Sequence, residues 1–132
     1  MSLENVEAVR AVYAEWAEGN FGAGVELHDP LIVFVAHPHQ PEAGHYFGKE
    51  GLREFMSAYL EPWTKLTFTA EELIDVDNSV VVSVRHRGSG KESGAPTELS
   101  FFQVWTFRGR AVVRIETFPE RAEALEAVGR SE

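Results

Sequence analysis

The fold is decided by the stretch Leu99-Ser-Phe-Phe-Gln-Val-Trp-Thr-Phe-Arg108, the dipeptide Gly109-Arg110 and the stretch Ala111-Val-Val-Arg-Ile-Glu-Thr-Phe118. Both stretches are rich in β-branched and aromatic residues, and a two-residue connection between them predicts a β-hairpin. Side chains alternate between the two faces of a strand, so the first stretch is apolar on both faces. This pattern is typical of a central strand that is covered on both sides. One of its faces carries Leu99, Phe101, Gln103, Trp105 and Phe107.

Gln103 interrupts this aromatic row with an uncharged amide. A buried amide costs free energy unless it finds hydrogen-bond partners. The residue is therefore either a satisfied polar group of the core or the anchor of a pocket, and the sequence leaves both readings open.

Composition predicts one globular domain that spans residues 1–132, with 44% hydrophobic and 25% charged residues. A net charge of -9 argues against nucleic acid and anionic membranes, because phosphate binding needs clustered Lys and Arg. The absence of cysteine excludes disulfides, thiolate nucleophiles and cysteine-based zinc sites. It fits a cytoplasmic location. We expect no signal peptide, and no apolar run approaches the roughly 20 residues of a membrane span.

Hydrophobic periodicity predicts an α+β domain with helices on one face of a curved, mostly antiparallel sheet. Glycine and proline mark most of the boundaries between its elements. Helices are expected at 3–18, 21–27, 49–61 and 120–128, and strands at 31–36, 66–76, 80–87, 99–108 and 111–118. The longest irregular stretch is expected at 37–48, and a flexible hairpin loop at 88–96.

Four segments carry a resemblance to a known family: Ala14-Glu-Trp-Ala-Glu-Gly-Asn-Phe21, Gly48-Lys-Glu-Gly-Leu-Arg-Glu-Phe55, Val104-Trp-Thr-Phe-Arg-Gly-Arg110 and Glu120-Arg-Ala-Glu-Ala-Leu125. Together they resemble the SnoaL-like branch of the nuclear transport factor 2-like superfamily. The resemblance implies a cone-shaped α+β barrel, in which a curved sheet wraps N-terminal helices and an internal pocket. Fold alone does not imply function, because this superfamily includes isomerases, cyclases, hydrolases and non-catalytic binding domains.

The catalytic residues of the best-known members do not carry over to this chain. The ketosteroid isomerase positions fall on Val12, Ala36 and Gln103, and the carboxylate position of SnoaL-type cyclases falls on Thr117. Each familiar carboxylate is missing, which argues against enolisation by either mechanism.

The resemblance also implies that position 103 points into the cone. Its face of the sheet then includes Val80, Val82, Val84, His86, Val113, Ile115 and Thr117. We expect a ligand to contact Tyr13, Trp16, Phe34, Phe101, Gln103, Trp105, Ile115 and Thr117. His86 and Gln103 form the one candidate catalytic pair, with imidazole as acid or base and the amide orienting a carbonyl or hydroxyl. The alternative is that both are satisfied core groups.

Other polar clusters have simpler interpretations. His37, His39 and His45 lack a carboxylate at a ligand spacing, so no metal and no cofactor are expected. His28-Asp29 precedes Pro30 and is interpreted as the cap of a helix end.

Two functions from different classes remain. The first is binding of a small hydrophobic, oxygen-bearing molecule of polyketide, terpene or steroid type, with acid–base chemistry of the isomerase, cyclase or hydrolase kind. The second is a non-catalytic ligand-binding or dimerisation domain that lacks the catalytic carboxylates. In either case we expect a homodimer through the convex sheet face, where Phe102 and Val104 would be exposed on a monomer.

Overall fold

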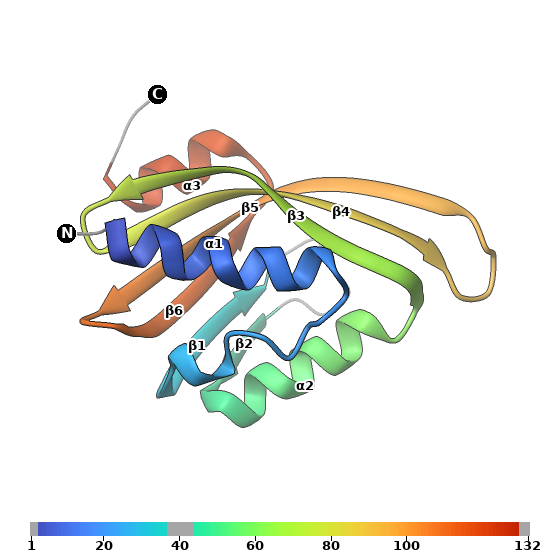
Figure 1. Ribbon diagram of the computed structural model, residues 1–132, viewed down its shortest axis with the longest axis horizontal. Helices are drawn as coiled ribbons and strands as arrows, with labels where there is room; N and C mark the ends of the chain where they lie inside the picture. The colour runs from blue at the N-terminus through green and yellow to red at the C-terminus, as the bar shows by residue number, and fades with distance from the viewer. Residues whose placement is uncertain (1–2, 37–43, 130–132) are drawn as a thin grey trace.

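The structure of the protein is a computed structural model that describes residues 3–36 and 44–129. It contains a six-stranded mixed sheet and three α-helices (Figure 1). The strand order is β2-β1-β6-β5-β4-β3, and the β1–β6 pair alone is parallel. The elements are α1 (Leu3–Ala17), η1 (Val25–Leu27), β1 (His28–Ala36), β2 (Gly44–Phe47), α2 (Gly48–Leu60), β3 (Trp63–Val76), β4 (Ser79–Gly90), β5 (Pro96–Arg108), β6 (Ala111–Phe118) and α3 (Arg121–Ala127). The predicted α+β class is confirmed, although the curved sheet stays open, with β2 and β3 at its edges.

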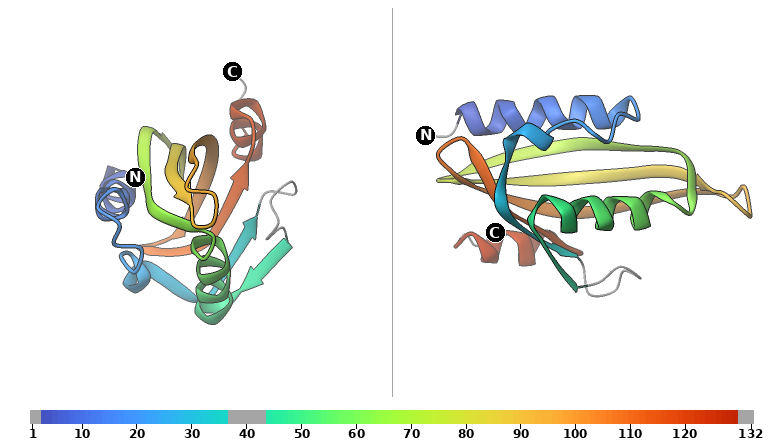
Figure 2. Two further views of the ribbon diagram at one scale, coloured as in Figure 1. Left: turned by 90° about the vertical axis from the view of Figure 1, so that its right-hand side faces the viewer. Right: turned by 90° about the horizontal axis from the view of Figure 1, so that it is seen from below.

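The helices cover both faces of the sheet, which corrects the expectation that all of them lie on one face. Figure 2 shows α1 and α3 on opposite sides of the sheet. Helix α1 packs mainly on β3 and α2 mainly on β1, whereas α3 contacts β4, β5 and β6. No helix among the described residues is long and apolar enough to cross a membrane.

The main core lies between α1, α2 and the concave face of the sheet. Helix α1 contributes Val6, Val9, Tyr13 and Trp16, whose spacing places them on one stripe, and all four are buried. They meet the inward residues of the central strands, among which Trp105 and Val82 are fully buried. The helix signal and the face assignment of β5 in the sequence were therefore correct.

A β-bulge changes the inward set on the last strand. Gln103 pairs with Thr117 and Trp105 with Ile115, but Phe107 pairs with Val112, because the register shifts between Thr106 and Phe107. Val112 is fully buried, whereas Val113 is half-buried. The expectation that Val113 faces inward is therefore wrong, since one extra residue in a strand moves the following side chains to the other face.

A second, smaller core lies under α3 on the convex face. Ala124 and Leu125 of this helix pack with Val76, Val81 and Val104. Val104 is 5% exposed, and Phe102 is half-buried against the same cluster. The expectation that both are exposed on a monomer is wrong, because an amphipathic helix after the last strand can cover either face.

Three local expectations also change. The segment 21–27 forms one 3-10 turn, Val25–Leu27, rather than a second helix, and part of the expected irregular stretch is strand β2. Gly88 and Gly90 belong to strand β4, so the β4–β5 hairpin is longer than predicted (Figure 1).

Candidate functional site

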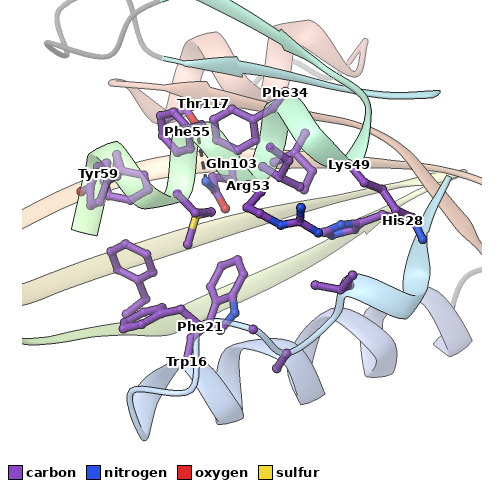
Figure 3. Close-up of a pocket in the computed structure, with 18 residues that line it drawn as sticks. Trp16, Phe21, His28, Phe34, Lys49, Arg53, Phe55, Tyr59, Gln103 and Thr117 are labelled. Atoms are coloured by element: carbon purple, nitrogen blue, oxygen red, sulfur yellow. Dashed lines mark hydrogen bonds between the residues drawn. The ribbon is translucent and has the colours of Figure 1, made fainter. Parts of the chain in front are cut away.

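A pocket of about 200 Å³ lies between α2, the connection from α1 to β1, and the concave face of the sheet (Figure 3). Its deep wall is apolar and buried, formed by Phe34, Leu52, Phe55, Phe68, Phe101 and Ile115. Its rim is formed by exposed or half-buried residues of the connection and of α2, including Phe21, Val25, Lys49, Arg53 and Met56. An apolar cavity with a few polar groups is the usual design of a small-molecule site.

Gln103 lies in the deep wall and is held by three side chains. Its Oε1 accepts hydrogen bonds from the Tyr13 hydroxyl and from Trp105 Nε1, the latter at 3.3 Å. Its Nε2 donates to Thr117 Oγ1 at 3.5 Å. Because an indole nitrogen can only donate, Trp105 fixes the orientation of the amide. The carbonyl of Gln103 therefore serves the core, its NH₂ group is directed at Thr117, and both residues line the pocket.

This arrangement keeps Tyr13 in its neutral form. Burial raises the pKa of the Tyr13 phenol far above its usual range, so the hydroxyl remains a donor to the amide. Replacing Gln103 by an apolar residue would leave the donors of Tyr13 and Trp105 buried without this acceptor. The residue thus combines both readings of the sequence, a core partner on one side and a polar group at the pocket on the other.

His86 is separated from Gln103. It pairs with Leu99 on β5, whereas Gln103 pairs with Val82, four residues away along β4 and therefore about 13 Å distant. His86 is fully buried, and its Nδ1 lies 2.7 Å from the Tyr59 hydroxyl. Its Nε2 has no partner among the described residues. The side chain is absent from the pocket lining, so the expected His86–Gln103 pair does not come together.

Burial lowers the pKa of His86 to about 4, which leaves the imidazole neutral at pH 7. The rings of Tyr59, Trp63 and Phe68 surround it, with centroids 4.6 to 5.7 Å away. These surroundings are those of a core histidine.

The rim carries three nitrogen-bearing side chains: His28, Lys49 and Arg53. Burial, and then the charge of Lys49, lower the pKa of His28 to about 4, against the opposing effect of Glu26. His28 is thus neutral at pH 7, whereas Lys49 and Arg53 are cationic. Asp29 Oδ1 accepts a hydrogen bond from the backbone N–H of Leu31 at 2.8 Å, and both residues lie in strand β1. The 3-10 turn before the strand ends with a bond from the backbone N–H of His28 to Val25, so the expected side-chain cap of a helix end is not formed.

Most of the predicted ligand contacts lie at the pocket. The structure places Trp16, Phe34, Phe101, Gln103, Ile115 and Thr117 in its lining. Tyr13 and Trp105 lie behind Gln103 and hold its carbonyl, so they would orient a ligand-binding group without touching the ligand.

Sequence reasoning missed the residues that α2 contributes. Lys49, Leu52, Arg53 and Met56 follow one another at the spacing i, i+3, i+4, i+7, which is one face of a helix, and all four line the pocket. The sequence did contain a signal for these residues, because two cations on the same helix face as apolar residues can indicate the rim of a pocket. The sequence contained no such signal for His28, because the strand was expected to begin only at Leu31.

Of the three histidines in the predicted irregular stretch, the structure describes one, His45. His45 is exposed on β2, and its ring stacks on Phe47. His37 and His39 lie outside the described residues. Within the described ranges, no three His, Cys, Asp or Glu side chains gather as a metal site would require.

Comparison with known proteins gives a consistent fold. A model of the SnoaL-like domain family matches residues 9–115. A nuclear transport factor 2-like protein of unknown function from Burkholderia pseudomallei aligns with 20% identity and a TM-score of 0.77, covering 98% of this chain and 100% of its own.

Two further crystal structures are similar. TerC, co-crystallised with polyporic acid, has 22% identity and a TM-score of 0.75, over 96% of this chain and 98% of its own. A hypothetical protein with a ketosteroid isomerase-like fold from Catenulispora acidiphila, in complex with trimethylamine, has 16% identity and a TM-score of 0.73, over 93% of this chain and 92% of its own. A search of curated proteins gave no match. Likenesses at these identities show the fold alone.

Proposed function

Because the chain belongs to the SnoaL-like family, we propose that it binds a small hydrophobic, oxygen-bearing molecule in its pocket, held in orientation by Gln103 and Thr117. The observation that carries the proposal is the fixed amide. Trp105 and Tyr13 occupy the carbonyl of Gln103, so its NH₂ group is directed toward Thr117, and both Gln103 and Thr117 line the pocket. A ligand oxygen that accepts a hydrogen bond from this group would be oriented within an otherwise apolar cavity.

Binding without catalysis is the form of the proposal that we favour. General acid–base catalysis needs a group whose pKa lies near the working pH. None of the described residues that line the pocket is Asp or Glu, and His28 has its pKa lowered to about 4. His86, the predicted acid or base, lies outside the lining. An isomerase, cyclase or hydrolase activity remains the alternative, to be tested by assaying bound compounds for turnover.

Thr117→Val tests the polar contact with the least disturbance of the fold. The variant keeps the shape of the side chain, and it leaves Gln103 bonded to Tyr13 and Trp105. We expect affinity for an oxygenated hydrophobic ligand to fall by about 1 kcal/mol, roughly fivefold, with little change in melting temperature. The measurement is a thermal-shift screen of steroid-, terpene- and polyketide-like compounds, followed by titration of the hits.

Thr106→Val is the matched control, because Thr106 lies on the same strand pair but faces away from the pocket, 3.5 Å from Ser79. It should leave affinity unchanged. If Thr117→Val binds all hits as tightly as the parent, or if no compound binds the parent, the proposed site is wrong.

We also propose that the protein forms a homodimer through the part of the convex face that α3 leaves uncovered. Leu31 is 82% exposed and Phe47 67% exposed at the β1–β2 edge. By register, Val33 and Val35 of β1 share a face with Arg114 and Glu116 of β6 and with Phe47. Apolar side chains beside a pair of opposite charges can complement a second copy related by a two-fold axis.

A further inference from the structure

We propose that the ligand is a small hydrophobic acid whose carboxylate lies at the rim beside Lys49 and Arg53, with its apolar body extending toward Gln103. The inference rests on the proposed binding function and adds the charge and the direction of the ligand. Figure 3 shows Gln103 and Thr117 at one side of the pocket and Lys49 and His28 at the other. The two ends of the cavity therefore offer different chemistry to the two ends of a molecule.

The charges at the rim oppose those of the whole chain. The protein has 21 acidic and 12 basic residues and a net charge of -9. Yet the described residues that line the pocket include two cations and no carboxylate. A local cationic site on an acidic protein attracts an anion over a short range, whereas the remaining surface repels it. This distribution favours an anionic ligand at the rim over a neutral or cationic one.

Both cations are available to a ligand. Lys49 is exposed and forms no ion pair within the part of the chain that the structure describes. Arg53 pairs with Glu50 at 2.8 Å, but their side chains are 71% and 75% exposed. An ion pair so open to water contributes little stability, so an incoming carboxylate can replace Glu50 at small cost. The planar guanidinium can bind both carboxylate oxygens.

His28 completes the rim as a neutral group. The charge of Lys49 helps burial to lower the pKa of His28, and both residues line the pocket. Glu26, which opposes this effect, is absent from the lining. A neutral imidazole adds one N–H donor without an acidic competitor.

The donors that line the pocket away from Lys49 and His28 favour an acceptor rather than a second charge on that part of the ligand. Trp16 lines the pocket, is 8% exposed, and its Nε1 has no partner among the described residues. An indole nitrogen can only donate, and a buried donor without a partner costs free energy. Together with the Gln103 amide, it favours a ketone or ether oxygen on the inner end of the ligand.

The test compares two probes of the same shape. One is an acetylnaphthoic acid, which carries a ketone at one end and a carboxylate at the other. The other is its neutral counterpart, in which a hydroxymethyl group replaces the carboxylate. Calorimetric titration of the parent should show the acid binding about tenfold more tightly. In the double variant Lys49→Gln, Arg53→Gln the affinity for the acid should fall about tenfold, while that for the alcohol stays unchanged.

The control is the double variant Lys65→Gln, Arg10→Gln, which removes the same charge outside the lining. Arg10 pairs with Glu7 at i,i+3 on α1 as Arg53 pairs with Glu50 on α2. This control variant should bind the acid more tightly than the alcohol, as the parent does. Equal binding of acid and alcohol to the parent would overturn this inference and leave the proposed function intact. Binding of neither probe would contradict both.

Discussion

At the scale of single residues, the two inward polar groups of the central strands have different surroundings. Gln103 keeps one side of its amide toward the pocket, whereas His86 is enclosed by aromatic rings and bonded to Tyr59. Both satisfy the same sequence pattern, a polar residue in an apolar row. Alternation gives the face of a side chain but not its position along the strand relative to a cavity, so the pattern could not separate them.

The enclosed imidazole predicts a dependence of stability on pH. Its pKa is lowered to about 4 in the folded protein, against about 6.5 in an unfolded chain. Between these values the unfolded state binds more protons, so the free energy of unfolding falls as pH decreases from about 6.5 toward 4. We expect His86 to contribute up to roughly 3 kcal/mol of this loss. His28, with a pKa lowered in the same direction, adds to it.

Denaturant unfolding at pH 7 and pH 4.5 measures the effect. His86→Asn should show a smaller loss between the two pH values than the parent. Carboxylate titrations contribute to both proteins and cancel in the difference. His45→Asn is the control, because His45 is exposed on β2. A variant His86→Asn with the same pH dependence as the parent would show that His86 is not held in its neutral form.

The rim shows a further limit of prediction at this scale. Lys49 and Arg53 lie in the helix expected at 49–61, and the sequence alone assigned them no role at the pocket. Their position at a cavity follows from the way α2 packs on β1, a tertiary contact. No local pattern contains that contact.

At the scale of elements, the connection from α1 to β1 depends on one glycine. Gly24 is buried with φ +92°, and an added Cβ would lie 2.8 Å from Val12 Cγ2. Gly24→Ala therefore combines left-handed backbone strain with a clash against α1. We expect a loss of about 2–4 kcal/mol in the free energy of unfolding, measured by denaturant titration. The same variant should bind pocket ligands more weakly, because Ala23, Val25 and His28 line the rim on either side.

Gly22→Ala is the matched control for stability, in the same connection. An added Cβ there has only Asn20 Oδ1 nearby, at 3.9 Å. Its free energy of unfolding should change by less than about 0.5 kcal/mol. Equal stability of the two variants would mean that Gly24 does not fix the path of the connection.

The elements themselves were largely predictable, because α1, α2 and the four long strands carry clear periodicities. The register between the strands and the side on which each helix packs were less predictable. Strand β2 is four residues long, too short for a periodic signal, and the bulge near Phe107 leaves no mark in the alternation of β6. The side on which α3 packs is likewise a choice between two apolar sheet faces. Register and packing side depend on tertiary contacts, which explains why Phe102 and Val104 were wrongly expected to be exposed on the convex face.

At the scale of the whole molecule, α3 divides the convex face into a covered and an open part. The part that α3 covers contains Val81 and Val104, and the open part contains Leu31, Phe47 and the Arg114–Glu116 pair. The pair, 3.2 Å apart, has side chains 42% and 28% exposed. A two-fold axis between two such faces would bring Arg114 of one protomer near Glu116 of the other. The arrangement predicts a homodimer through the open part.

Phe47→Glu should therefore give monomers, because it places a charge without a partner at the centre of the apolar contact. Sedimentation velocity at micromolar concentration measures the change, with the parent expected as a dimer. Leu99→Glu is the control, since Leu99 is also an exposed apolar residue, at 45%, but lies opposite His86 on the β4–β5 arm. It should leave the dimer intact. A monomeric parent would contradict the proposed dimer, and a dimeric Phe47→Glu would show that the two copies meet elsewhere.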